Sequence, residues 1–452
     1  MTRFRDSIRG TRRATRSFLI YGTVGGTAGR ADGEFPPSPG PPVGLRRLAR
    51  MFPDIRIGRT LVESGRRRLE TESRFAVLLV RLSDFSEVRR RSREAAADLL
   101  LDAARAIDEG CRETGALWGP IEQDMFGLFL PDADDEAARA AVERVRAAFG
   151  GRRTHPLTAG IAVHPFAGFR RPRVFGNARK ALDHAERIGP GATAVFDAVS
   201  LHISGDRRYR TGDIRGAIAE FKEALTLSPD DPNLLNSLGV CYGVRGALDA
   251  ALDHFRRAAR LASGEMMPVY NAGVVHRLRA EPERALERFE AAIRVGGIVF
   301  EAVFQAGRIY LETGDPETAR DRFRTAVELR PRSGTAHRFL AESLRALDRP
   351  RDALATLRRA ASLNPRDAVG LSLLGEWMDI QGEDPDIALL YCRHSVEIAP
   401  ENGECHRRHG DACLRRGLLA PALAAYETAS RRGADCADRI RRLRTRRASR
   451  VS

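Results

Sequence analysis

Lysine is nearly absent from this sequence, and so are several features that mark particular classes of protein. Among 75 basic residues only Lys180 and Lys222 are lysines, so the positive charge is almost entirely arginine. A coding bias toward arginine explains this as well as selection for phosphate contacts does. No apolar run approaches the roughly 18 residues that a membrane-spanning helix needs. We therefore expect no membrane span.

Cysteines are few, and their spacing does not suit a metal. The six cysteines form no CxxC pair, as is typical of reduced thiols in a cytoplasmic protein. Sulfur and imidazole are good zinc ligands, and one short stretch holds several of them: Cys392, His394, Cys405, His406, His409 and Cys413. Their spacing fits no familiar zinc module, and two of these cysteines fall at core positions of predicted helices. We expect no metal site.

Catalytic signatures are missing as well. The sequence contains no GxSxG, HExxH or protein-kinase motif, and its ten histidines fall mostly on predicted helices. We expect neither a classical catalytic arrangement nor a bound cofactor.

The net charge of +15 is concentrated at the two ends of the chain. Residues 1–74 carry a net +9 and residues 431–452 a net +7, so the residues between them are left at −1. Arg-rich ends can touch a nucleic acid or an anionic surface through counterion release, but short charged ends are more often solvated. We expect the function to lie in the near-neutral body of the chain.

The first 48 residues are predicted to form a flexible, basic tail rich in proline and glycine. Arg12-Arg13 precede a short apolar stretch, superficially like a twin-arginine export signal. That stretch is short and is followed by several glycines, so we favour a cytoplasmic location over export.

From residue 198 to residue 434, small and bulky residues recur with a step of 34 residues, and one step is a residue longer. The first column is alanine throughout: Ala217, Ala251, Ala285, Ala319, Ala353, Ala388 and Ala422. Four residues after each comes a bulkier one: Phe221, Phe255, Phe289, Phe323, Leu357, Cys392 and Tyr426. Another small residue follows three later. This spacing predicts one face of a helix against which a neighbouring helix packs closely.

An earlier helix precedes each of these helices, and glycines such as Gly212 and Gly314 separate the two. The 34-residue period, the unit of two helices and the columns of small and bulky residues together resemble the tetratricopeptide repeat. The resemblance implies an all-α superhelix, an α-solenoid of about seven repeats over residues 198–434. Residues 435–452 would follow as a basic capping helix or tail.

In such arrays fixed positions of the first helices line the inner wall, where partners bind. Those positions hold Asn233, Asn236, Tyr270, Arg277, Phe304, Arg308, Arg338, Glu342 and Arg345, followed by Glu376, Asp379, Arg407 and Asp411. Arginines pair with carboxylates and rings stack on side chains, so this groove suits an extended acidic, partly apolar peptide. The Lys/Asn clamp of chaperone-binding members is not reproduced, because its first two positions hold His202 and Asp206.

Residues 49–197 show strands that alternate with helices. Strands are predicted at 75–80, 116–130 (a hairpin), 157–163 and 192–196, and helices at 93–111, 134–149 and 175–187. The pattern predicts an α+β domain with helices packed on a sheet.

Four motifs of this segment occur in a recognisable order: Leu82-Ser-Asp-Phe85, Met125-Phe-Gly-Leu-Phe-Leu-Pro131, Thr158-Ala-Gly-Ile-Ala162 and Ala178-Arg-Lys-Ala-Leu182. They resemble the GGDEF domain, the diguanylate cyclase module of bacterial signalling. The resemblance implies a palm-like sheet of the nucleotide-cyclase type.

The resemblance also implies that the family's chemistry has been lost. Arg81 stands where the family has a metal-binding Asp, and a fixed cation there repels a metal. The signature positions read Glu122-Gln123-Asp124-Met125-Phe126, without the two glycines. The family's guanine-contacting Asn is Arg89 here, and its phosphate-contacting Lys is Glu186. We expect no cyclase activity, and retain Arg81, Asp98 and Asp124 as candidates for residual nucleotide binding.

Two hypotheses of function follow. The favoured one is a non-enzymatic bacterial adaptor that binds a protein or peptide partner in the repeat groove. Its degenerate GGDEF-like domain would serve dimerisation, as a homodimer, or sensing. The other hypothesis is a signalling protein that still handles GTP or cyclic di-GMP, by binding or by weak cyclase activity.

Overall fold

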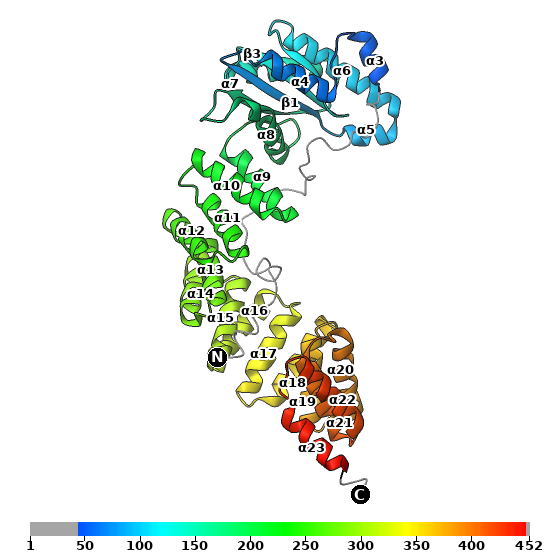
Figure 1. The fold of residues 1–452 in the computed structure, drawn as a ribbon, viewed down its shortest axis with the longest axis vertical. Helices are drawn as coiled ribbons and strands as arrows, with labels where there is room; N and C mark the ends of the chain where they lie inside the picture. The colour runs from blue at the N-terminus through cyan, green and yellow to red at the C-terminus, as the bar shows by residue number, and fades with distance from the viewer. Residues whose placement is uncertain (1–43, 449–452) are drawn as a thin grey trace. The chain divides into compact units, whose positions relative to one another are not determined.

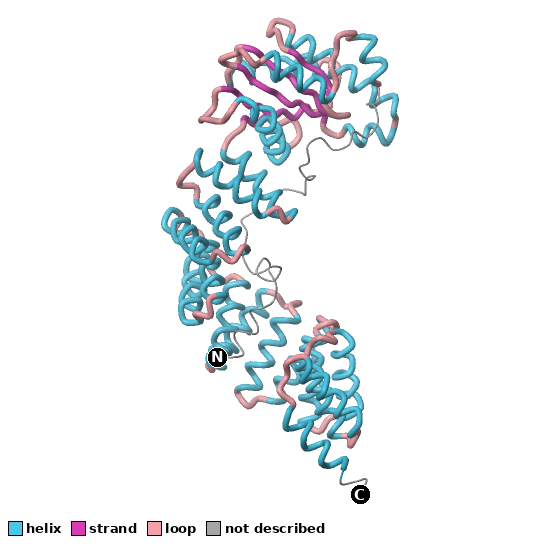
Figure 2. Tube along the Cα trace, in the orientation of Figure 1, coloured by secondary structure: helices cyan, strands magenta, loops and turns pink. Residues whose placement is uncertain are grey.

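The computed structural model describes residues 44–448, and these residues form two compact units that divide between Ala262 and Ser263. Among the described residues strands occur only in the first unit, whereas the second unit is entirely helical (Figures 1 and 2). The predicted tail lies outside the described residues up to residue 43, including the Arg12-Arg13 pair. Its last residues are helical, because α3 (Leu45–Met51) begins there. None of the described helices is long and apolar enough to cross a membrane.

A five-stranded sheet forms the centre of the first unit. The strands are β1 (Phe75–Leu82), β2 (Leu117–Pro120), β3 (Met125–Pro131), β4 (Leu157–His164) and β5 (Thr193–Val195), in the order β2-β3-β1-β4-β5. β1 pairs antiparallel with β3 and β4, and only the β4–β5 pair is parallel. The predicted strands are therefore confirmed. β1 reads as a continuous apolar run because both of its faces are covered.

Helices cover both faces of this sheet (Figure 1). On one face α6 (Arg93–Cys111) and α7 (Asp135–Gly150) bury a core that includes Leu78, Ile107 and Val142. On the other face lie α4 (Gly58–Arg68) and α8 (Val174–Ile188). Both approach the sheet at a glycine: a Cβ on Gly65 would lie 2.4 Å from the Phe129 ring, and one on Gly160 would lie 2.1 Å from the backbone of α8. The short α5 (Phe85–Arg91) and a 3-10 turn at Arg171–Arg173 complete the domain.

The first two repeats belong to the same unit as the sheet. They comprise α9 (Ala198–Thr211), α10 (Ile214–Leu227), α11 (Pro232–Val244) and α12 (Leu248–Leu261). Partly buried ion pairs join them to α8: Lys180 Nζ lies 2.7 Å from Glu220 Oε2, and Arg207 Nη1 lies 2.8 Å from Asp183 Oδ2. The predicted domain boundary at residue 197 thus lies inside the first unit, and the two units divide within the repeats.

The second unit continues the helix pairs. It contains α13 (Met266–Leu278), α14 (Pro282–Gly296), α15 (Phe300–Thr313), α16 (Pro316–Leu329), α17 (Gly334–Ala346), α18 (Pro350–Leu363), α19 (Ala368–Ile380), α20 (Pro385–Ile398), α21 (Gly403–Arg415), α22 (Leu419–Arg431) and α23 (Ala437–Ala448). α9–α22 therefore make seven pairs, and α23 lies within the predicted C-terminal helix or tail.

Each pair is held together by a small residue of the first helix against the bulky column of the second. A Cβ on Gly205 would lie 2.4 Å from the Phe221 ring, and one on Gly307 would lie 3.0 Å from the Phe323 ring. The alanine column is buried without exception. In the fifth repeat both partners change together, because Ala341 takes the glycine position and Leu357 the ring position. A larger first-helix residue is thus matched by a smaller second-helix residue, as close packing requires.

Candidate functional site

The first helix of each repeat in the second unit is buried on the side that meets its second helix, which leaves the polar residues on its other side. These side chains contact one another from helix to helix, and we call them the first-helix face. They come from α13, α15, α17, α19 and α21: Arg277, Phe304, Arg308, Arg338, Phe339, Glu342, Arg345, Glu376, Arg407, Arg408 and Asp411.

Arg308 on α15 lies close enough to Arg277 on the preceding first helix to affect the pKa of Arg277. Burial and then the positive charge of Arg308 lower the pKa of Arg277 to about 10. Glu312 offsets part of this effect, since its carboxylate lies 3.2 Å from the Arg308 guanidinium. The Arg308 side chain is only 15% exposed. Two neighbouring, partly buried guanidinium groups favour the binding of an anion.

Aromatic rings lie next to this arginine pair. The rings of Phe304 on α15 and Phe339 on α17 meet edge to face with centroids 5.3 Å apart. The Arg308 guanidinium lies 5.4 Å from the centroid of Phe339, and that of Arg338 lies 4.3 Å from it. The rings therefore add an apolar contact surface to a cationic one, and cation–π contacts hold the guanidinium groups over them.

Arg338 links α17 to the start of α19. Its Nε donates to Oδ2 of Asp367 at 2.9 Å, and the same carboxylate caps α19 by accepting from the Gly370 backbone at 3.1 Å. Arg338 also pairs with Glu342, one turn along its own helix. Burial raises the pKa of Glu342, and Arg338 opposes that rise. Arg338 is therefore largely neutralised, and it acts mainly as a support for this part of the face.

The carboxylates at the C-terminal end of the face are also paired. Glu376 contacts both Arg407 and Arg408, at 3.4 Å and 3.2 Å. Asp411 contacts Arg407 at 2.6 Å and accepts a hydrogen bond from the Tyr426 hydroxyl at 2.7 Å. These carboxylates are therefore already paired with neighbouring arginines. The Arg277–Arg308 pair and its aromatic neighbours lie on α13, α15 and α17.

The structure distributes the predicted groove residues unevenly. Arg277, Phe304, Arg308, Arg338 and Glu342 come together as described. Arg345 is exposed, and its guanidinium lies 5.2 Å from the ring centroid of Trp377.

The remaining groove residues do not belong to this face. Tyr270 is 2% exposed and packs on Phe289, with ring centroids 5.4 Å apart, so it supports the face from beneath. Asn233 and Asn236 lie on α11 in the first unit, where Asn233 is exposed and Asn236 is buried. Asp379 pairs with Arg415 and Arg416 and is only 4% exposed.

Sequence reasoning missed Phe339 and Arg408, which occupy equivalent places in their repeats directly after Arg338 and Arg407. The columns used for prediction did not include this position. The sequence does contain a sign of this position, because an arginine is followed by Phe339 in one first helix and by Arg408 at the equivalent point of another.

A second charged cluster lies at the end of β1 in the first unit. Arg81 forms ion pairs with Glu186 on α8, with Glu122 at 3.4 Å and with Asp124 at 3.8 Å. Burial acts to lower the pKa of Arg81, but the nearby carboxylates outweigh it and hold this pKa above its ordinary value. Burial also raises the pKa of Asp124, against the opposing charge of Arg81. The guanidinium group thus neutralises the carboxylates around it.

Asp98 does not join this cluster. It lies on α6, where its carboxylate is 3.0 Å from the Arg47 guanidinium of α3. Within residues 44–448 no group of His, Cys, Asp and Glu side chains is arranged to hold a metal ion. The cysteines of the predicted Cys/His stretch are buried in the repeats, consistent with core positions.

Comparisons with known proteins identify the repeats. The family model described as tetratricopeptide repeat matches residues 204–265 and 304–368, so these parts of the chain contain tetratricopeptide repeats. Such repeats build extended surfaces that bind other proteins. No curated protein matches the chain.

Solved structures with a similar fold include several repeat proteins. A tetratricopeptide repeat protein from Parabacteroides merdae is 18% identical, with a TM-score of 0.43, and the match covers 54% of this chain and 96% of that one. PilF from Pseudomonas aeruginosa is 18% identical, with a TM-score of 0.42 and coverage of 45% and 92%. YrrB, described as a TPR protein with an unusual peptide-binding site, is 22% identical, with a TM-score of 0.34 and coverage of 39% and 90%.

Proposed function

We propose that this protein is a non-enzymatic adaptor whose first-helix face binds an acidic, partly apolar segment of a partner protein. The observation that carries the proposal is the Arg277–Arg308 pair beside the Phe304 and Phe339 rings. Burial and then the charge of Arg308 lower the pKa of Arg277, and a carboxylate bound beside the two guanidinium groups would oppose both effects. The rings offer a surface for an apolar side chain next to that carboxylate.

A binding assay with a matched pair of double variants tests this function. In Arg308→Glu with Arg345→Glu, one introduced carboxylate would pair with Arg277 in place of the ligand. The control is Arg324→Glu with Arg393→Glu, which makes the same charge change on the second helices α16 and α20, where the two side chains are 74% and 64% exposed.

The probe is an array of peptides that combine Asp or Glu with Leu or Phe. We expect wild type and control to select the same peptides, and the face variant to bind them about 10- to 100-fold more weakly. Equal binding by the face variant and the control would refute this surface, and so would the absence of any selection by wild type.

For the sheet domain we propose a GGDEF-like relative without cyclase activity that serves dimerisation or sensing. The Arg81 cluster supports this, because a guanidinium group that is already paired with several carboxylates leaves no site for the metal on GTP. The same pairing argues against Arg81 as a phosphate contact, and hence against a nucleotide-handling protein. Incubation of the full chain with GTP and Mg²⁺, followed by chromatography, should yield no cyclic di-GMP. Calorimetric binding of GTP or cyclic di-GMP would favour the alternative.

A further inference from the structure

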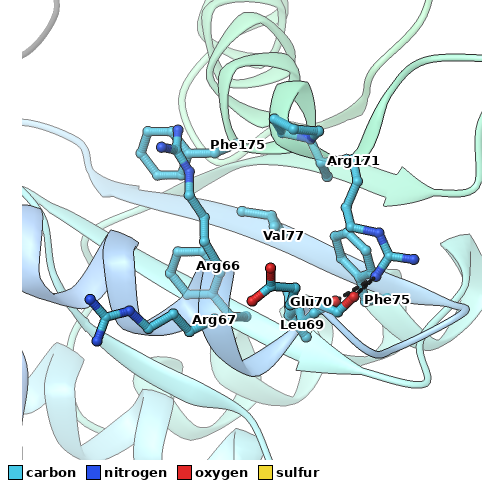
Figure 3. Close-up of a pocket in the computed structure, with 11 residues that line it drawn as sticks. Arg66, Arg67, Leu69, Glu70, Phe75, Val77, Arg171 and Phe175 are labelled. Atoms are coloured by element: carbon cyan, nitrogen blue, oxygen red, sulfur yellow. Dashed lines mark hydrogen bonds between the residues drawn. The ribbon is translucent and has the colours of Figure 1, made fainter.

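A cavity of about 300 Å³ opens on the sheet face between α4 and α8, in the first unit (Figure 3). Its floor consists of Phe75 and Val77 on β1 and Phe129 on β3, which are all buried. Glycines allow close approach of both helices to the sheet beside the cavity: Gly65 of α4 lies against Phe129, and Gly160 of β4 lies against α8.

Charged groups of both signs surround this apolar floor. Arg171 is held in place, because its Nη1 donates to the backbone carbonyls of Leu69, Glu70 and Glu72 at 2.7, 2.8 and 2.6 Å. Its guanidinium also lies 5.4 Å from the centroid of the Phe75 ring. Figure 3 shows Arg66 reaching toward Phe175, with the Glu70 carboxylate between Arg66 and Arg171.

Arg66 and Glu70 are exposed, and neither has an ion-pair partner among residues 44–448. Their charges are therefore available to a ligand. Arg67 also lines the cavity and adds positive charge at its edge.

We propose that this cavity binds a free α-amino acid with an apolar side chain. The side chain would lie toward Phe75, Val77 and Phe129, the α-carboxylate would pair with Arg66, and the α-ammonium group would pair with Glu70. An anion without an ammonium group would be repelled by Glu70, and a cation would be repelled by the arginines. The volume lies at the lower end of the range for ligand pockets, which favours a ligand of this size over a large cofactor.

Calorimetry of the full chain with defined small molecules tests the proposal. We expect saturable binding of L-phenylalanine or L-leucine. 3-Phenylpropionate, which lacks the ammonium group, and phenethylamine, which lacks the carboxylate, should bind at least about tenfold more weakly, because each loses one charge-assisted contact.

Neutral variants assign the contacts. Arg66→Gln and Glu70→Gln should each weaken L-phenylalanine binding by at least about tenfold, and Glu70→Gln should also abolish the preference over 3-phenylpropionate. The controls Arg90→Gln and Glu113→Gln change exposed residues of the same domain that do not line the cavity, and should leave binding unchanged. Thermal melting confirms that all four variants are folded.

Three results would overturn the proposal. The first is that no apolar amino acid binds wild type, and the second is that 3-phenylpropionate binds as tightly as L-phenylalanine. The third is that the control variants lose as much affinity as Arg66→Gln and Glu70→Gln. None of these results bears on the first-helix face, whose assay uses peptides and other residues.

Discussion

The guanidinium group of Arg81 at the end of β1 forms an ion pair with the carboxylate of Glu186 on α8, across the face of the sheet. Arg81 also lies near Glu122 and Asp124, so one guanidinium group faces several carboxylates. The pair therefore connects the strand to the helix.

We predict that Arg81→Glu destabilises the first unit by roughly 2–3 kcal/mol, because it would leave several carboxylates together in a partly buried place. Arg81→Glu combined with Glu186→Arg should recover about half of this loss, since the attraction is restored while the surrounding carboxylates now face one another. Urea denaturation of wild type and the variants measures both effects. A single variant within about 0.5 kcal/mol of wild type would show that the pair contributes little.

Glycine substitutions in two repeats should differ in their effect on stability. A Cβ at position 205 would lie 2.4 Å from the Phe221 ring, whereas one at position 307 would lie 3.0 Å from the Phe323 ring. Alanine gains about 1 kcal/mol over glycine in helix propensity at either site. We expect Gly205→Ala to be destabilised by about 1–2 kcal/mol and Gly307→Ala to be close to neutral. Denaturant titration measures the free energy of unfolding of both variants. If Gly307→Ala were the more destabilised of the two, this account of the packing between paired helices would be wrong.

His202 makes the stability of the first unit depend on pH. Its ring is buried, with Nε2 lying 3.1 Å from the Ser237 hydroxyl, and burial lowers the pKa of His202 below 6.5, although Asp206 opposes the shift. The unfolded chain therefore takes up a proton at this residue more readily than the folded chain. Stability is unaffected above about pH 6.5 and falls as the pH drops below it, by at most about 1.4 kcal/mol per pH unit.

Chemical denaturation at pH 7.5 and at pH 5.5 measures this dependence. His202→Gln should be less stable than wild type at the higher pH and should lose less stability between the two pH values. If both proteins lose the same amount, another group is responsible for the acid sensitivity.

The six cysteines should react slowly in the folded protein. All are buried, and burial raises the pKa of the Cys392 thiol to about 12 and that of Cys111 to about 11. The thiolate is the reactive form of cysteine. A thiol reagent at pH 8 should therefore label, on average, less than about one thiol per native molecule within minutes, and all six after denaturation. Rapid labelling of Cys392 without unfolding would contradict its burial. Zinc should protect none of the thiols.

The repeated architecture was predictable from the sequence because its columns are local. The spacing that places Ala319, Phe323 and Ala326 on one face lies within two turns of a single helix, so it needs no knowledge of distant residues. The strands around the Phe75 run were predictable for the same reason. The pairing order of those strands depends on contacts over long sequence separations and was seen only in the structure.

The candidate site was predictable only in part. Arg277, Phe304 and Arg308 fall in columns of the repeat and do come together. Tyr270 occupies such a column too, yet it is buried, because its orientation depends on the ring of Phe289 in the following helix. The sequence also could not show that the carboxylates of Glu376 and Asp411 are already paired with arginines.

What the sequence by itself determined is the period of the chain and the identity of its buried columns. These follow from residue type and local spacing, which the backbone geometry of a helix or strand converts directly into a face. Tertiary structure alone decided which charged groups lie near one another. Arg277 and Arg308 lie near each other in space, Arg338 is neutralised by Asp367, and Arg66 and Glu70 flank a cavity between two helices, because electrostatic pairing depends on distances that only the folded chain sets.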